Sequence, residues 1–200
     1  KKKTTNLSFY GSQVLPKKHN HIIFRFKNFK LIYNDPRRFG FFKILKNKKD
    51  YLKFFTRIGP EAISKDFNKK YLDKILKNRT KNIKNLLLDQ KLVSGLGNIY
   101  VNEILFQAKI NPFRKSFLIN LDENKRIVKY SKIILKKAIH FGGSSIRDFK
   151  GITGKSGNFQ SEFKVYDRAK KRCSRNNCFG QISRKIISNR STFICSVCQK

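Results

Sequence analysis

The cysteines constrain this sequence most, because all four lie near its carboxyl end as Cys173-x4-Cys178-x16-Cys195-x2-Cys198. Two close pairs separated by an insert of hairpin length are typical of a zinc site, in which each pair forms one knuckle around the metal. Two disulfides or four unrelated thiols are the alternatives, and the lack of a readable secretory signal favours zinc. Four thiolates leave no coordination position for water, so one structural Zn(II) per chain is predicted. A tail this short and polar forms no sufficient core, so the metal would supply its folding free energy.

The insert between the two cysteine pairs has the pattern of a β-hairpin. Residues 182–187 and 192–194 are rich in β-branched and aromatic side chains, and the polar residues 188–191 separate them. We therefore predict a metal-stiffened hairpin whose turn presents Arg190 outward. Taken alone, a surface arginine in water is the simpler interpretation of this residue.

The charge of the chain indicates a polyanionic partner. The sequence has 47 Lys and Arg against 12 Asp and Glu, a net charge of +35. Codon bias in an AT-rich genome accounts for abundant lysine but not for the shortage of acids, so nucleic acid is the expected partner. No long uncharged apolar run and no leader are readable, which predicts a cytoplasmic, nucleoid-associated protein without a membrane span. The chain has no methionine and opens on three lysines, so we expect that its natural amino terminus is absent.

Hydrophobic periodicity divides the chain into a strand-rich part, a helical part and the cysteine-bearing tail. Residues 5–57 are aromatic and β-branched, and "HIIFRFKNFKLIYN" suggests an antiparallel pair with one basic face. Helical spacing begins near residue 64, is interrupted at "VSGLGN", and resumes in "NIYVNEILFQA". The longest helix is predicted over 121–140, where Asn120 and Glu123 have the spacing of a capping box.

One loop, "NDPRRFG" at residues 34–40, combines two arginines and an aromatic ring between a turn opener and a glycine. Asp and Pro favour the start of a turn, and glycine permits the chain to leave it. The loop alone is equally compatible with an exposed ring and with an ordinary hairpin turn in which Phe39 is packed into the core.

Five stretches, taken in order, resemble bacterial formamidopyrimidine-DNA glycosylase over nearly the whole chain. They are "DPRRFG", "LLLDQKLVSGLGNIYVNEILFQAKINP", "GGSSIRDF", "GKSGNFQSEFKVYDR" and "NRSTFICSVCQK". The sister family, endonuclease VIII, generally lacks the "DPRRFG" loop. The resemblance implies an α+β fold with a partial N-terminal β-sandwich at 1–60, a helix-two-turn-helix domain at 64–160 and a zinc-finger hairpin at 165–200. It also implies that DNA lies between the lobes.

The resemblance further implies roles for individual side chains. Phe39 would fill the gap left by an extruded nucleotide, and Arg37 would engage the orphaned partner base. Phe9 lies at the position of a third wedge, which is methionine in the family. Asn98 would bind a phosphate, and Arg190 would clamp the phosphate on the other side of the lesion. Arg190 is also the family's proposed proton donor in the final elimination. The remaining implied DNA contacts are His19, Arg79, Lys155 and Tyr166.

The activity implied is excision of oxidised purines from duplex DNA followed by cleavage of the abasic site, which makes the family a glycosylase and lyase in DNA repair. Its nucleophile is an amino-terminal proline amine, and no such residue is present among the 200. We therefore expect a monomer that binds duplex DNA containing a damaged base or an abasic site without cutting it. The alternative is a non-catalytic zinc-hairpin module that holds nucleic acid by charge.

Overall fold

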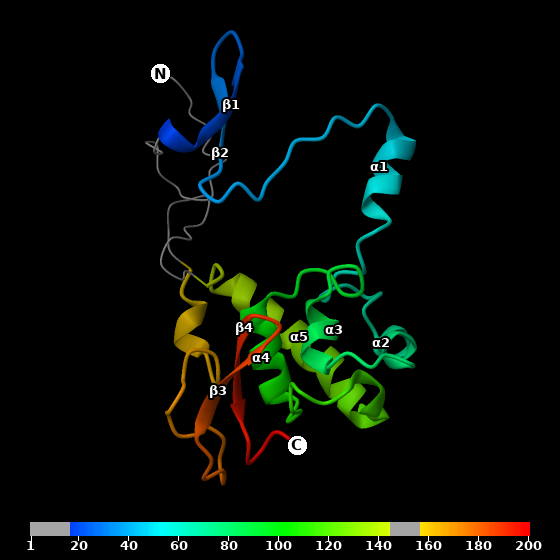
Figure 1. Cartoon of the computed structure of the whole chain (residues 1–200), viewed down its shortest axis with the longest axis vertical. Helices are drawn as coiled ribbons and strands as arrows, with labels where there is room; N and C mark the ends of the chain where they lie inside the picture. The colour runs from blue at the N-terminus through cyan, green and yellow to red at the C-terminus, as the bar shows by residue number, and fades with distance from the viewer. Residues whose placement is uncertain (1–16, 145–156) are drawn as a thin grey trace. The chain divides into compact units, whose positions relative to one another are not determined.

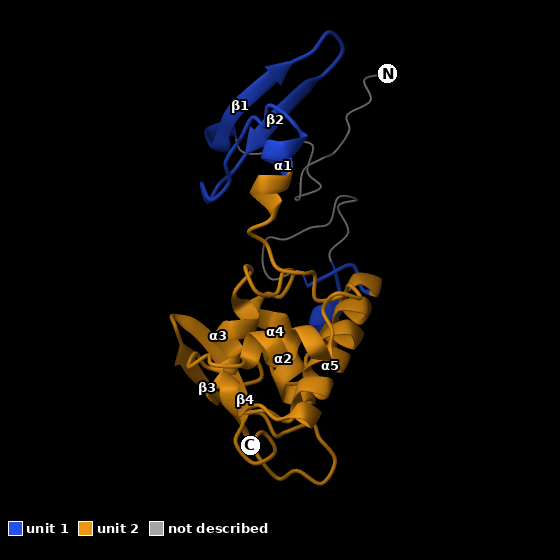
Figure 2. Cartoon of the chain, turned by 90° about the vertical axis from the view of Figure 1, so that its right-hand side faces the viewer, with its two compact units in different colours: residues 1–51, 141–160 blue, residues 52–140, 161–200 orange. Residues whose placement is uncertain are grey.

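The computed structural model describes residues 17–144 and 157–200 and divides the chain into two compact units. Figure 1 labels helices and strands along the chain. The first unit comprises residues 1–51 and 141–160, and the second comprises residues 52–140 and 161–200 (Figure 2). The domain boundaries predicted from the sequence, near 60–64 and 160–165, stay a prediction. Within the described ranges no helix is both long and apolar enough for a membrane span.

The first unit contains a β-hairpin. A short 3-10 helix, η1 (Lys17–His19), leads into β1 (Asn20–Arg25), which pairs antiparallel with β2 (Lys30–Asn34). The register places Ile23 opposite Ile32 and confirms the antiparallel pair predicted for this stretch. Between residues 17 and 51 these two strands form the only sheet, so the predicted sandwich is not confirmed.

A helix follows where the sequence pattern predicted strands up to residue 57. The helix α1 (Lys48–Phe55) is preceded by Asn47, whose side-chain oxygen accepts a hydrogen bond from the Asp50 N–H at 2.9 Å. This asparagine cap satisfies an amide that has no partner inside the helix, and it outweighs the strand preference of the aromatic residues. The strand assignment was therefore wrong for this segment.

The second unit is built on four helices, α2 (Lys69–Leu76), α3 (Ile83–Leu88), α4 (Asn98–Gln107) and α5 (Leu121–His140). The bounds of α5 agree with the prediction, and its capping box is confirmed. The Glu123 N–H donates to Asn120 Oδ1 at 2.9 Å, and Glu123 Oε2 accepts the Asn120 N–H at 3.0 Å. The helices enclose a core whose fully buried members include Phe67, Leu72, Ile83, Leu86, Leu87, Ile104, Leu105 and Ile127.

The carboxyl-terminal hairpin packs on this helical core. Strand β3 (Ile182–Ile187) pairs antiparallel with β4 (Arg190–Cys195). The turn has two residues, Ser188 and Asn189, both with positive φ, so β4 begins two residues earlier than the sequence predicted. One apolar cluster joins the two parts, with Phe106 of α4 beside Val165, Cys173, Cys178, Ile182, Phe193 and Cys195.

Candidate functional site

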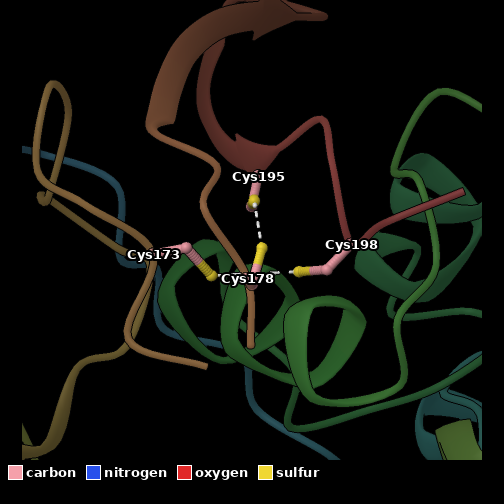
Figure 3. A group of neighbouring side chains, drawn as sticks. All are labelled: Cys173, Cys178, Cys195 and Cys198. Carbon is pink, nitrogen blue, oxygen red and sulfur yellow. Dashed lines mark hydrogen bonds between the residues drawn. The ribbon is translucent and has the colours of Figure 1, made fainter. Parts of the chain in front are cut away.

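The four cysteines converge on one point (Figure 3). Their sulfur atoms all lie within 4.8 Å of one another, with 3.9 Å between Cys173 and Cys198 and 3.6 Å between Cys178 and Cys195. A tetrahedral zinc site with Zn–S bonds of about 2.3 Å places its sulfur atoms about 3.8 Å apart. Disulfide sulfurs lie about 2.05 Å apart, so these cysteines are free thiols. The geometry therefore fits a four-thiolate zinc centre.

The surroundings of the cysteines favour a bound cation. Burial raises the pKa of the Cys173 thiol to about 12, and it also raises the pKa of Cys198. A thiolate at these positions needs a compensating positive charge, which a metal supplies as it displaces the thiol protons. Gly180 leaves room for this arrangement, because a Cβ there would lie 2.5 Å from the Cys195 sulfur.

A buried polar cluster holds the hairpin against α3 and α4. Lys84 Nζ donates to the carbonyl oxygen of Ser191 at 2.8 Å and to Thr192 Oγ1 at 2.7 Å. Asn98 Nδ2 donates to the same Ser191 oxygen at 3.0 Å. Ser191 follows Arg190 directly, so these contacts fix where the hairpin presents the exposed Arg190 side chain. Asn98 therefore contacts the residue that follows Arg190 in the chain.

Asn98 begins α4 but does not cap it. The capping position is Gly97, and the Asn98 amide is instead used in the hydrogen bond to Ser191. The first amide groups of a ten-residue helix are left without partners inside the helix, which makes this end suitable for an anion.

Lys84 is a functional candidate that the sequence reasoning missed. Lys84 is 0% exposed, whereas the other lysines within residues 17–144 and 157–200 are accessible. Burial lowers the pKa of Lys84 to about 8, and the nearby positive charge of Arg190 lowers this pKa as well. The only available signal was a lysine in the short helix α3, beside the apolar residues Ile83 and Leu86, and the abundance of lysine obscures it.

The lowered pKa of Lys84 predicts that the free energy of unfolding depends on pH. Between pH 8 and pH 10.5 the unfolded chain binds more protons at this lysine than the folded chain does, so the contribution of Lys84 to the unfolding free energy rises with pH. The rise is about 3 kcal/mol over the whole window. We expect urea unfolding to show that the wild type gains stability relative to Lys84→Met as the pH is raised. A stability difference that is constant across this window would contradict the prediction.

A second buried group, Glu103, holds the segment that contains Tyr166. Its carboxylate accepts the backbone N–H groups of Lys164, Val165 and Tyr166 at 3.0, 2.9 and 2.8 Å. Burial raises the pKa of Glu103, while these three hydrogen bonds lower it. The Tyr166 ring lies 5.0 Å from the Phe193 ring of β4, so the segment and the hairpin are packed together. This carboxylate was also missed by the sequence reasoning.

In the first unit the loop at residues 34–40 exposes its aromatic ring. The Phe39 side chain is 79% exposed, and the guanidinium carbon of Arg37 lies 5.1 Å from the centre of the Phe39 ring. The interpretation in which Phe39 is packed into the core is therefore wrong. Instead, the loop carries the stacked pair of a cation and a ring on its surface.

The other residues singled out from the sequence have different surroundings. His19 is half-buried in η1, and its carbonyl oxygen accepts the Asp35 N–H at 3.0 Å. Arg79 is half-buried just after α2. Phe9 and Lys155 lie outside the described residues.

Comparison with known proteins finds a matching family model and several similar sequences. The family model described as the formamidopyrimidine-DNA glycosylase H2TH domain matches residues 58–150. A formamidopyrimidine-DNA glycosylase of Roseobacter denitrificans is 43% identical over 194 residues, which cover 96% of this chain and 69% of the relative. The one from Zymomonas mobilis is 44% identical over 185 residues, covering 92% of this chain and 67% of the relative.

Solved structures of similar proteins resemble the fold of this chain. The Lactococcus lactis enzyme bound to DNA containing an abasic site has a TM-score of 0.81 and 37% identity, covering 94% of this chain and 69% of that chain. A complex with DNA containing carbocyclic 8-oxoguanine has a TM-score of 0.81 and 36% identity, covering 94% of this chain and 68% of that chain. Both proteins were solved with damaged or abasic DNA.

Proposed function

The chain belongs to the formamidopyrimidine-DNA glycosylase family, and on that premise we propose that it recognises a damaged or abasic nucleotide in duplex DNA during DNA repair. The observation that carries this proposal is the exposed pair of Arg37 and Phe39. Extruding a nucleotide costs a few kcal/mol of stacking, and a side chain that fills the gap offsets that cost. Proteins that kink DNA commonly insert apolar wedges from the minor groove in this way.

We assign the two members of this pair different roles. Phe39 fills the gap left in the stack, since a flat apolar ring replaces the stacking of a lost base. Arg37 donates hydrogen bonds to the orphaned partner base, since a guanidinium offers several donors in a fixed plane. Phe9, which the family resemblance places at a third wedge position, would extend the same function.

Asn98 and Arg190 are the proposed phosphate contacts of the second unit, one on each side of the damaged nucleotide. Support comes from the hydrogen bond between Asn98 and Ser191, which follows Arg190, and from the position of Asn98 at the start of α4, where a helix can bind an anion. Contacts of this kind position a protein on DNA without reading its sequence. Arg190 is assigned to phosphate binding rather than to proton donation, because a guanidinium releases a proton reluctantly. His19, Arg79, Lys155 and Tyr166 are proposed as further DNA contacts.

One structural zinc ion per chain is part of this proposal, held by Cys173, Cys178, Cys195 and Cys198. The metal would fix the two cysteine knuckles, one of which precedes β3 while the other lies at the end of β4. All four positions of a tetrahedral ion are then taken by sulfur, so the ion stabilises the fold and has no part in the chemistry.

We further propose that glycosylase and lyase chemistry in this family requires the amino-terminal proline amine, and that the 200 residues bind DNA without it. A duplex containing 8-oxoguanine, incubated with the polypeptide and analysed on a denaturing gel, would remain intact. Strand cleavage, together with a covalent protein–DNA adduct after reduction of the Schiff base by borohydride, would instead show that another amine in the chain acts as a nucleophile.

The proposal is tested by equilibrium binding to two duplexes of identical sequence, one of which carries a tetrahydrofuran abasic analogue. We expect tighter binding to the abasic duplex at physiological salt, where charge alone gives weak, non-specific affinity. The alternative function, a charge-only zinc-hairpin module, predicts equal affinity for the two duplexes. The pairing of the exposed Phe39 with Arg37 favours the first function, since a module that binds by charge needs no ring held beside its guanidinium.

A further inference from the structure

One carboxylate organises the loop that carries Arg37 and Phe39. Asp35 Oδ1 accepts the backbone N–H groups of Arg37 and Arg38 at 3.1 and 2.9 Å. Its other oxygen, Oδ2, accepts the Gly40 N–H at 2.8 Å and the Tyr33 hydroxyl at 2.9 Å. Both oxygens are thus engaged by the residues on either side of Phe39. Such hydrogen bonds to a charged acceptor are stronger than those between neutral groups.

The backbone of Asp35 is also held in place. Its N–H donates to the His19 carbonyl oxygen at 3.0 Å, and its own carbonyl oxygen lies 2.9 Å from His21 Nε2. Both histidines belong to the segment that contains η1 and β1, so these contacts tie the loop to the hairpin. Asp35 therefore links the position of the loop to the β-hairpin.

The loop needs this support because its conformation is unfavourable by itself. Arg38 has φ +54°, a left-handed conformation that side chains other than glycine rarely adopt. Gly40 lies so close to Tyr33 that a Cβ would be 1.9 Å from the tyrosine oxygen. The residues that flank Phe39 are thus held in place by hydrogen bonds to Asp35 and by the lack of a side chain at Gly40.

We propose that Asp35 is a positioning residue for damage recognition: its carboxylate, backed by Tyr33, holds Arg37 and Phe39 in the geometry that fills a vacancy in the duplex, without contacting DNA itself. This inference rests on the proposed function of the loop. In a chain with so few acids, a carboxylate within a DNA-binding loop opposes binding to phosphate, so its role must be something other than attraction.

The proposed role predicts that Asp35→Asn affects the affinities for the intact and the abasic duplex differently. The substitution removes one negative charge, so affinity for the intact duplex should stay the same or increase. It also replaces an acceptor by an NH2 group facing the donors of the loop, so preference for the abasic duplex should fall about tenfold. A role in overall stability would lower both affinities together. A role in electrostatics alone would raise both together.

The experiment measures the ratio of the two dissociation constants, for the tetrahydrofuran duplex and the intact duplex, in the full chain. Asp50→Asn is the matched control, since it makes the same charge change in α1 and should leave the ratio unchanged. Tyr33→Phe removes one hydrogen bond and should reduce the ratio less than Asp35→Asn. Gly40→Ala disturbs the same contacts without a change of charge and should also lower the ratio, so it decides the matter if Asp35→Asn does not fold.

The outcomes separate this inference from the proposed function. If the wild type does not distinguish the two duplexes, the proposed function itself is wrong. If the wild type does distinguish them, and both Asp35→Asn and Gly40→Ala retain the full ratio, the loop does not depend on the carboxylate and the inference about Asp35 is overturned.

Discussion

Removal of the metal should unfold the carboxyl-terminal hairpin and abolish DNA binding by the second unit. The cysteines form part of the apolar cluster that joins Phe106 to Phe193, so the loss of the knuckles exposes this cluster to water. Structural zinc sites in small domains supply about 10–16 kcal/mol of apparent binding free energy, which is the free energy that folds them. We expect the same result from prolonged chelation and from Cys195→Ser.

The measurement combines a zinc count with limited proteolysis of the tail. Native protein should release one zinc ion per chain on denaturation, and chelated protein should be cleaved within β3 and β4. Ser196→Ala is the matched control, because Ser196 is exposed between two of the cysteines and should leave both readouts unchanged. Purified protein that contains two disulfides and no zinc would contradict the assignment.

Truncation of the exposed ring should remove damage recognition without loss of general affinity. Phe39→Ala is expected to weaken binding to the abasic duplex by about 1–3 kcal/mol, the range for stacking between a base and an aromatic side chain. Arg37→Ala should have a similar effect, through the lost hydrogen bonds to the partner base. Affinity for the intact duplex should change little, because phosphate contacts supply most of it.

A neighbouring ring provides the control for this experiment. Phe41 is 70% exposed and lies two residues beyond Phe39, so Phe41→Ala removes a comparable apolar surface from the same segment. Its effect on the ratio of affinities should be small. Equal losses for Phe39→Ala and Phe41→Ala would indicate a general apolar contact rather than a specific wedge.

The structure was predicted correctly from the sequence where a local signal determines it. The capping box at Asn120 and Glu123 predicted where α5 begins, because its two hydrogen bonds are made within four residues. The spacing of the cysteines predicted one cluster, since two knuckles joined by a hairpin bring four sulfurs together. The family motifs were recognised for a similar reason, since each is a short stretch of contiguous residues.

Residues whose surroundings depend on contacts between distant segments were not predicted from the sequence. Lys84 is buried because it meets Ser191 and Thr192, more than one hundred residues later in the chain. Glu103 is likewise explained only by its contacts with residues 164–166. The helix α1 was missed for a different reason, because aromatic side chains suggested a strand and the single cap at Asn47 was overlooked. Charge alone could not reveal any of these, in a sequence with 47 basic residues.

The central claim, that Phe39 enters the vacancy in a duplex, is tested most directly by fluorescence of 2-aminopurine placed beside a tetrahydrofuran site. Stacking of the ring against this base should quench its emission when the wild type binds. The Phe39→Ala complex, at saturating protein, should retain the emission of the free duplex. Equal quenching by the wild type and by Phe39→Ala would show that this ring does not occupy the vacancy.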